Sequence, residues 1–124
     1  MFKVAVAHSL ELDSAEAVAD MLGQCRGQLG DLKPQAGLLF AGIDHYFTLI
    51  LKEIHAAYPD IELIGCTTDG EVSSVHGYAD DSLVLMAFYS DELVFKAGVA
   101  DDIFQDEVRT TKSALKSALS SLGQ

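Results

Sequence analysis

The segment from Gly65 to Glu71 holds the densest set of side chains in this 124-residue chain that could bind a ligand or do chemistry. It directly follows the apolar run 61–64, and its residues are Gly65, Cys66, Thr67, Thr68, Asp69, Gly70 and Glu71. Hydroxyl groups both donate and accept hydrogen bonds, and carboxylates attract ammonium groups. The segment therefore predicts a loop that binds a small polar molecule carrying an amine.

The two glycines of this loop have the spacing of a phosphate-binding motif, but the charge is reversed. In that motif the second glycine is followed by Lys and then by Ser or Thr, whereas Gly70 is followed by Glu71. No Lys or Arg occurs between Lys52 and Lys96, and this interval contains nine acidic residues. Phosphate would be repelled, which argues against a nucleotide ligand. The alternative is that the glycines only allow tight turns in a solvated polar loop.

A second interpretation makes Cys66 a nucleophile with His8 or His76 as its base. A reactive thiolate needs positive neighbours, and Asp69 and Glu71 disfavour it. These residues include ligand types that zinc accepts, but their spacing specifies no zinc site. The motifs of serine hydrolases, dinucleotide-binding proteins and zinc proteases are absent. We therefore expect a non-catalytic binding domain with no cofactor, and a cysteine-dependent hydrolase using Cys66 is the lesser alternative.

The length and composition fit one domain with a core of ordinary size, since 49% of the residues are hydrophobic. The net charge of -11 opposes binding to nucleic acid and to anionic membranes, which both require clustered Lys or Arg. No apolar run is long enough for a membrane span, and the chain does not begin as a secretory signal does, so we expect a cytoplasmic protein. Cys25 and Cys66 are far apart in sequence and are expected to be reduced thiols.

The first half of the chain alternates predicted strands and helices. Strands are expected at 2–8, 36–41 and 61–64, and the helices between them are expected to begin at Asp13 and Asp44, which can act as caps. A βαβαβ order with right-handed crossovers makes the strands parallel. The predicted buried face of the first helix is Ala15, Val18, Ala19, Leu22, Cys25 and Leu29, and that of the second is Phe47, Ile50, Leu51, Ile54 and Tyr58.

The second half predicts an antiparallel hairpin and a last helix. Apolar strands at 82–89 and 92–99 are joined by the short turn Ser90-Asp91, which requires an antiparallel pair. The expected fold is therefore α/β, with a mixed five-stranded sheet and helices packed on it. The last helix is expected to turn its apolar residues inward and to end at Gly123; those residues are Val108, Leu115, Leu119 and Leu122.

Ligands of open parallel sheets bind outside the carboxyl ends of the strands. The loops His8-Ser9, 42–44 and 65–71 follow the three predicted parallel strands, so their polar groups are expected to face one pocket. Gly42 therefore joins the residues 65–71 as a candidate ligand contact. Asp44 is expected to cap its helix rather than touch the ligand.

Three segments of the chain resemble the amino-terminal part of the FIST domain. They are Gly37 to Gly42, Leu63 to Ser73 and Asp81 to Ala87, and the glycine, cysteine, double threonine, glycine and acid of the second segment recur as a block in that family. Asp69 departs from the family, which usually has Ala there. The resemblance implies a sensory input domain of signal-transduction proteins, with small ligands such as amino acids.

The resemblance also implies partners and a longer parent. Members of the family are joined to output modules for chemotaxis, kinase or cyclic-nucleotide signalling, and usually continue into a carboxy-terminal FIST domain. Residues 1–124 are therefore expected to form one FIST N-like domain, either a fragment or a minimal version. The alternative is an interaction or dimerisation module without a ligand, in which an exposed hairpin edge contacts another domain or a second copy.

Overall fold

The computed structural model of the protein describes residues 1–122, which fall into two compact units. The first unit, Met1–Leu93, contains all of the β-structure and two helices. The second begins at Val94 and contains one helix. The candidate binding segment lies within the first unit, so the fold of that unit determines the site.

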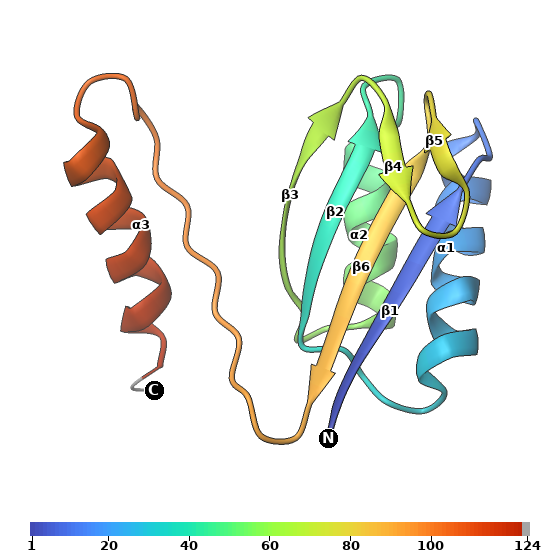
Figure 1. Cartoon of the computed structure of the whole chain (residues 1–124), viewed down its shortest axis with the longest axis horizontal. Helices are drawn as coiled ribbons and strands as arrows, with labels where there is room; N and C mark the ends of the chain where they lie inside the picture. Colours follow the sequence, from blue (N-terminus) through green and yellow to red (C-terminus); the bar gives the residue numbers. More distant parts are fainter. Residues whose placement is uncertain (123–124) are drawn as a thin grey trace. The chain divides into compact units, whose positions relative to one another are not determined.

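The main sheet of the first unit has four strands in the order β1 (Phe2–Ser9), β6 (Leu83–Ser90), β2 (Ala36–Gly42) and β3 (Glu62–Thr68) (Figure 1). Strands β2 and β3 are parallel, while β6 is antiparallel to both β1 and β2. β1, β2 and β3 therefore run in one direction, which confirms the predicted parallel set. The last strand in sequence lies between the first two.

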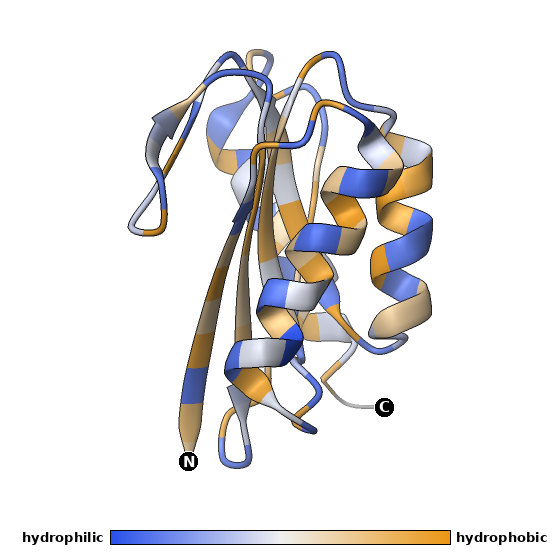
Figure 2. Ribbon diagram, turned by 90° about the vertical axis from the view of Figure 1, so that its right-hand side faces the viewer, coloured by the Kyte–Doolittle hydropathy of each residue, from blue (hydrophilic) through white to orange (hydrophobic). Residues whose placement is uncertain are grey.

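Helices α1 (Ser14–Leu29) and α2 (Phe47–Ala57) pack on the same face of this sheet (Figure 2). Successive side chains of a strand point to opposite faces, so alternate strand residues meet the helices. The opposite face has no helix of this unit on it; Val4 and Ile64 lie there on the two outer strands and are 38% and 44% exposed. The core between sheet and helices includes Ala5, Ala7, Met21, Cys25, Ile50, Ile54, Leu83 and Leu85.

The predicted helix faces are largely right. In α1 the buried stripe passes through Ala17 and Met21 rather than Ala15 and Ala19, which are exposed. In α2, Leu51 is 41% exposed although its spacing predicted a core position. The remaining members of the two predicted faces are buried or half-buried, namely Val18, Leu22, Cys25, Leu29, Phe47, Ile50, Ile54 and Tyr58.

The predicted cap of α1 is confirmed, and that of α2 is wrong. Asp13 accepts hydrogen bonds from two main-chain N–H groups in the first turn of α1. Asp44 precedes α2 without capping it, because the cap position is taken by Tyr46. The N–H group of Tyr46 is satisfied instead by the Ser14 hydroxyl at 2.8 Å, and His45 donates from Nε2 to the carbonyl of Asp81.

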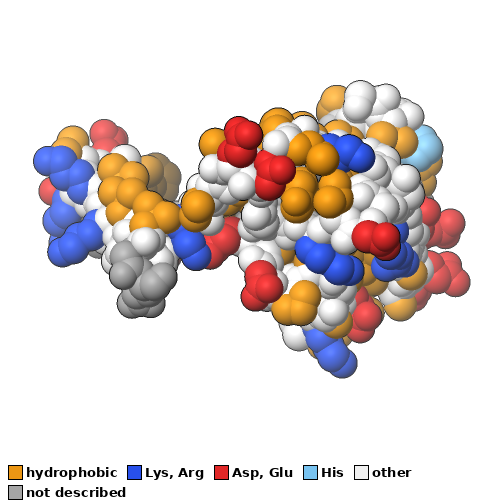
Figure 3. Space-filling model, turned by 90° about the horizontal axis from the view of Figure 1, so that it is seen from below, with side chains coloured by type: hydrophobic (Ala, Val, Ile, Leu, Met, Phe, Trp, Pro, Cys, Tyr) orange, Lys and Arg blue, Asp and Glu red, His pale blue; other side chains and the backbone are white. Residues whose placement is uncertain are grey.

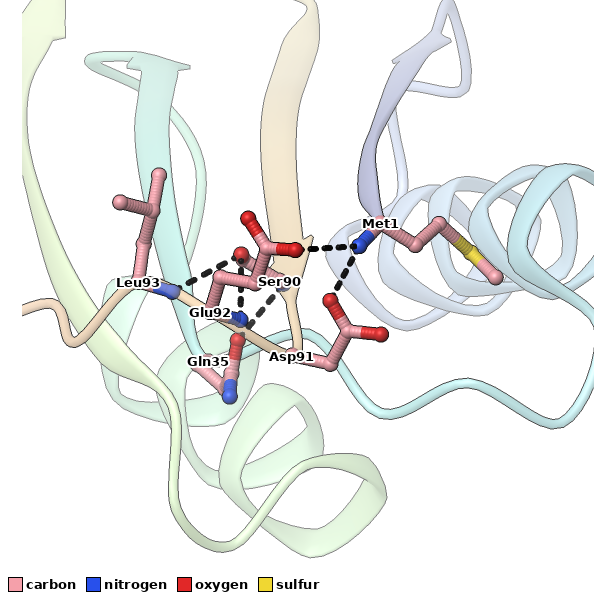
Figure 4. A network of polar contacts seen from close by, with 6 residues as sticks. All are labelled: Met1, Gln35, Ser90, Asp91, Glu92 and Leu93. Carbon is pink, nitrogen blue, oxygen red and sulfur yellow. Dashed lines mark hydrogen bonds and ion pairs between the residues drawn. The ribbon is translucent and has the colours of Figure 1, made fainter.

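The predicted hairpin of 82–89 with 92–99 does not form, so the five-stranded sheet is wrong. Both sides of β6 are already paired, with β1 and β2, and no edge is left for residues 92–99. The chain also turns away at Ser90, whose hydroxyl accepts from the N–H groups of Glu92 and Leu93 (Figure 4). The Gln35 side chain accepts from the Ser90 N–H at 2.8 Å, and the terminal ammonium binds Asp91.

A second, two-stranded sheet stands where the sequence predicted only a loop. Strands β4 (Glu71–Ser73) and β5 (Gly77–Ala79) form a short antiparallel hairpin between β3 and β6 (Figure 1). The β-structure is therefore a four-stranded mixed sheet with a separate two-stranded one. The hairpin begins at the last residue of the candidate binding segment.

The second unit is an extended segment followed by α3 (Glu107–Ser120). Asp106 caps this helix by accepting from the Arg109 N–H at 2.9 Å. Gly98 packs closely on the helix, since a Cβ atom there would lie 2.0 Å from the carbonyl oxygen of Ala114. Gly123 lies outside the described residues.

The apolar side of α3 was expected to face inward, and this is wrong. Its residues are at least 49% exposed; they are Val108, Leu115, Leu119 and Leu122. Figure 3 shows that hydrophobic side chains as well as Lys and Arg side chains lie at the surface of this unit. The spacing that predicts a buried stripe is that of an amphipathic helix, but it does not supply the surface that would cover the stripe. None of the helices within residues 1–122 is long and apolar enough to cross a membrane.

Candidate functional site

A groove of about 380 Å³ runs beside the outer strand β3, between the sheet and α2. Its walls are mainly apolar side chains of β2, β3 and α2, and Cys66, Thr67 and His55 supply the polar groups. The other lining residues are Leu39, Ala41, Phe47, Leu51, Leu63, Ile64 and Gly65. A concave apolar site of a few hundred Å³ with a few polar groups is typical of sites that bind small molecules.

Gly65 has a structural role at the edge of this groove. A Cβ atom at this position would lie 1.7 Å from the carbonyl oxygen of Leu39 on the neighbouring strand, far inside van der Waals contact. Only glycine lets β3 approach β2 this closely. The glycine that resembled part of a phosphate-binding motif therefore permits the close approach of two strands.

Glu71 lies at the other end of the predicted binding segment and is buried, with 2% of its surface exposed. Its carboxylate accepts from the Thr68 hydroxyl, from the Ser82 N–H at 2.9 Å and from the Ser82 hydroxyl at 2.6 Å. These bonds tie the end of β3 to the beginning of β6. We call this three-residue arrangement of Thr68, Glu71 and Ser82 the clasp.

The clasp continues into a fully buried histidine. His8 Nε2 lies 2.8 Å from the Ser82 hydroxyl oxygen, and His8 Nδ1 lies 2.7 Å from that of Ser73. Because the Ser82 hydroxyl donates to Glu71, it accepts from the Nε2–H of His8. Nδ1 of the neutral ring then accepts from the Ser73 hydroxyl, so every polar hydrogen in the chain of bonds has an acceptor.

Burial favours this neutral ring. It lowers the pKa of His8 below its usual value; the nearby His76 acts in the same direction, and the Glu71 carboxylate opposes it. His76 stands edge-on to His8, with the ring centres 5.4 Å apart, and is exposed. His8 therefore links β1 to the β4–β5 hairpin as an uncharged hydrogen-bonding group.

The structure places most of the predicted site residues in one of two groups. Gly65, Cys66 and Thr67 line the groove. Thr68 and Glu71 belong to the clasp, where the Glu71 carboxylate is turned inward.

The three remaining predicted residues lie in neither group. Asp69 is exposed in the bend between Thr68 and Glu71. Gly70 packs under the Tyr78 ring, since a Cβ atom there would lie 2.6 Å from it. Gly42 packs on the main chain of Asp81 and donates its N–H to the Ser82 carbonyl at 2.9 Å.

The sequence interpretation missed the α2 wall of the groove. Phe47, Leu51 and His55 line it and recur every four residues, which places them along one side of a helix. That spacing was the available signal, but Phe47 and Leu51 had been assigned to the core face. Ser82 was also missed as a partner of Glu71, because the sequence placed it as the first residue of an apolar strand.

The geometry around Cys66 differs from that of a nucleophile with a base. Cys66 is exposed on β3, whereas both ring nitrogens of His8 are bonded to serine hydroxyls. Cys25 is buried, which raises the pKa of its thiol to about 11. In the described part of the chain, no three His, Cys, Asp or Glu side chains are placed to hold a metal ion together.

Comparison with known proteins gives one match. Residues 35–123 match the family model described as FIST N domain. No curated protein and no solved structure matches the chain. The matched range includes the groove, the clasp and α3, and begins after β1 and α1.

Proposed function

Because this chain belongs to the FIST N domain family, a family of sensory domains, we propose that it is a signal-input domain whose ligand binds in the groove beside β3. The observation that carries this proposal is an open apolar groove ending at Cys66 and Thr67, two residues of the block that recurs in the family. The domain binds its ligand without chemical conversion. The proposed receptor function is thus located in the groove beside β3.

The ligand that best fits the groove is an amino acid with an apolar side chain. The apolar walls formed by Leu39, Phe47 and Leu51 take up the side chain of the ligand, and the Thr67 hydroxyl bonds its polar end. Asp69 is exposed two residues beyond Thr67 and attracts the ammonium group. Glu71 is not part of this contact, because its carboxylate is buried in the clasp.

A signal requires that the ligand bind one arrangement of the domain better than another. The clasp supplies a route for such a difference, since it joins the end of the groove strand to the beginning of β6 and to the β4–β5 hairpin. A ligand that moves Thr67 also shifts Thr68, whose hydroxyl is held by Glu71. We therefore propose that the hairpin passes the signal to a downstream domain.

A thermal-shift screen with the twenty amino acids and with polyamines tests the ligand. A ligand that binds only the folded state raises the melting temperature as its concentration rises above Kd. We expect an apolar amino acid to stabilise the protein, Thr67→Val and the groove-filling Leu51→Trp to abolish the shift, and Asp69→Ala to reduce it. Thr111→Val and Asp60→Ala change exposed residues elsewhere and should keep the full shift.

Two results would contradict this assignment. If no compound raises the melting temperature, the groove does not bind an amino acid. If a compound does so equally in the wild type and in Leu51→Trp, it binds elsewhere on the domain. Circular dichroism of each variant establishes that the fold is retained before the shifts are compared.

A further inference from the structure

The turn that joins β4 to β5, residues 74–76, is organised around one side-chain oxygen. Ser73 Oγ accepts from the main-chain N–H groups of Val75 at 3.1 Å and of His76 at 3.2 Å. The same hydroxyl donates its hydrogen to His8 Nδ1, which lies 2.7 Å away. A hydroxyl has one hydrogen and two acceptor lone pairs, so the bonding capacity of Ser73 is fully used. The turn and the buried histidine therefore share one saturated oxygen atom.

The charged form of His8 does not fit this arrangement. The neutral ring carries its hydrogen on Nε2, which donates to the Ser82 hydroxyl just before β6, and it accepts at Nδ1. In the charged ring both nitrogens carry a hydrogen. The Nδ1–H group then points at an oxygen whose two lone pairs already accept, and the Ser73 hydrogen loses its acceptor. Protonation of His8 therefore breaks at least one of the two bonds that hold the turn.

The groups around the ring decide when it takes up this proton. Burial lowers the pKa of His8 most; His76 in the turn acts in the same direction, and the Glu71 carboxylate on β4 opposes both. Helix α1 faces His8 with the neutral amide of Gln24, which also binds the carboxylate of Asp20. Because the turn lies against the ring, opening it admits water and moves His76 away. Proton uptake and opening of the turn therefore favour each other.

We propose that uptake of a proton by His8 releases the turn 74–76 from β1, while the main sheet, α1 and α2 remain folded. The base of the hairpin stays attached, because the bonds between Glu71 and Ser82 in the clasp do not use the Ser73 oxygen. Such a local opening requires less free energy than unfolding of the whole unit. The proton concentration is then a second input to the domain, and it acts whether or not the groove binds a ligand.

NMR spectroscopy of the isotope-labelled protein between about pH 7.5 and about pH 5 tests the release. At the higher pH the His8 ring should carry its hydrogen on Nε2 and none on Nδ1, and Nδ1 should take up a proton below about pH 6.5. With the same midpoint, the protection of the amides of residues 75 and 76 against hydrogen exchange should fall at least about fivefold, after correction for the intrinsic pH dependence. The amides of Leu39 and Leu85 in the central strands should keep their protection.

Three variants separate this release from a general loss of structure. His76→Gln removes a group that opposes protonation of His8, so the midpoint should move to higher pH while the release persists. Ser73→Ala removes the shared oxygen and should leave the turn amides unprotected at every pH. Ser74→Ala changes the exposed serine next to it and should retain the pH-dependent release.

Two results would overturn the proposal. In the first, the turn amides keep their protection although Nδ1 takes up its proton, or the His8 ring stays neutral throughout the titration. In the second, Leu39 and Leu85 lose protection with the same midpoint as the turn, which would make the opening global.

Discussion

His8 shows how a residue suited to catalysis can serve the fold. Its type and its place at the end of a strand make it a candidate base, yet both ring nitrogens are engaged by Ser73 and Ser82. The ring is fully buried and bonds the first strand of the chain to a hairpin some 65 residues later. Its protonation therefore affects the stability of the fold.

We predict that the protein loses stability as the pH falls below about 6.5, the usual pKa of histidine. Burial and His76 lower the pKa of His8 in the folded state, so the unfolded chain binds its proton first, and the contribution is complete only above that pH. One such group changes the free energy of unfolding by at most about 1.4 kcal/mol per pH unit. Urea titrations at several pH values measure this slope.

The control for this prediction is a variant with a neutral side chain. Gln at position 8 offers one amide donor and one amide acceptor at all these pH values, so His8→Gln should flatten the slope between pH 7.5 and about 5.5. Equal slopes in the wild type and in His8→Gln would show that other groups cause the pH dependence.

The sequence predicted one loop from Gly65 to Glu71 with the same role for both of its acids, whereas residues 65–68 belong to β3 and the two acids lie in different surroundings. Asp69 and Glu71 have similar chemistry and are two positions apart, so their residue types predict the same role for both. Glu71 is buried because Ser82, eleven residues later, offers two donors to its carboxylate. A hydrogen-bond partner that only the tertiary structure brings close leaves no local pattern in the sequence.

At the scale of the elements, the four strands of the main sheet were predicted, but β4 and β5 were not, and the strand predicted at 92–99 does not form. The alternating apolar residues 93, 95, 97 and 99 predicted a strand, and the short turn before them predicted its partner. That pattern reports a half-buried surface, whereas strand pairing depends on which edges are free. β6 is inserted between β1 and β2 through contacts across most of the unit, and both of its edges are used.

We predict that the double variant Gln24→Ala, Gln28→Ala is less stable and self-associates. It loses four hydrogen bonds to the β1 main chain, each worth roughly 1 kcal/mol, and leaves the main-chain groups of Val6 and His8 on the β1 edge unpaired. Urea unfolding and light scattering report the two effects. Arg26→Ala changes an exposed residue of the same helix and serves as the control; aggregation equal to that of this control would refute the role of the glutamines.

At the scale of the whole molecule, the predicted fold class was correct, but the predicted number of strands in the main sheet was not. The parallel strand set, both sheet-packed helices and the third helix were all predicted from periodicity and crossover rules. The exposed apolar side of α3 could not be foreseen, because amphipathic spacing describes a helix and not its partner. The family match begins at residue 35, yet β1 and α1 are integral to the same compact unit.

The charge distribution leads to a prediction for the entire protein. The unit Met1–Leu93 carries the whole net charge of -11, since acids and bases are equal in number from Val94 onward. Self-repulsion destabilises such a fold, and salt screens it. We expect the melting temperature to rise by a few degrees between about 50 mM and about 500 mM NaCl. A melting temperature independent of salt would contradict this expectation.

The contrast between the exposed Asp69 and the clasped Glu71 also bears on how such domains diversify. Asp69 is exposed, so its side chain can be exchanged with little effect on the stability of the fold, while the proposed contact with the ligand changes. Mutations of Glu71 leave buried hydrogen-bond donors without an acceptor and therefore destabilise the fold. If Asp69 contacts the ligand as proposed, a lineage that exchanges this residue and keeps Glu71 can alter its ligand at little risk of misfolding.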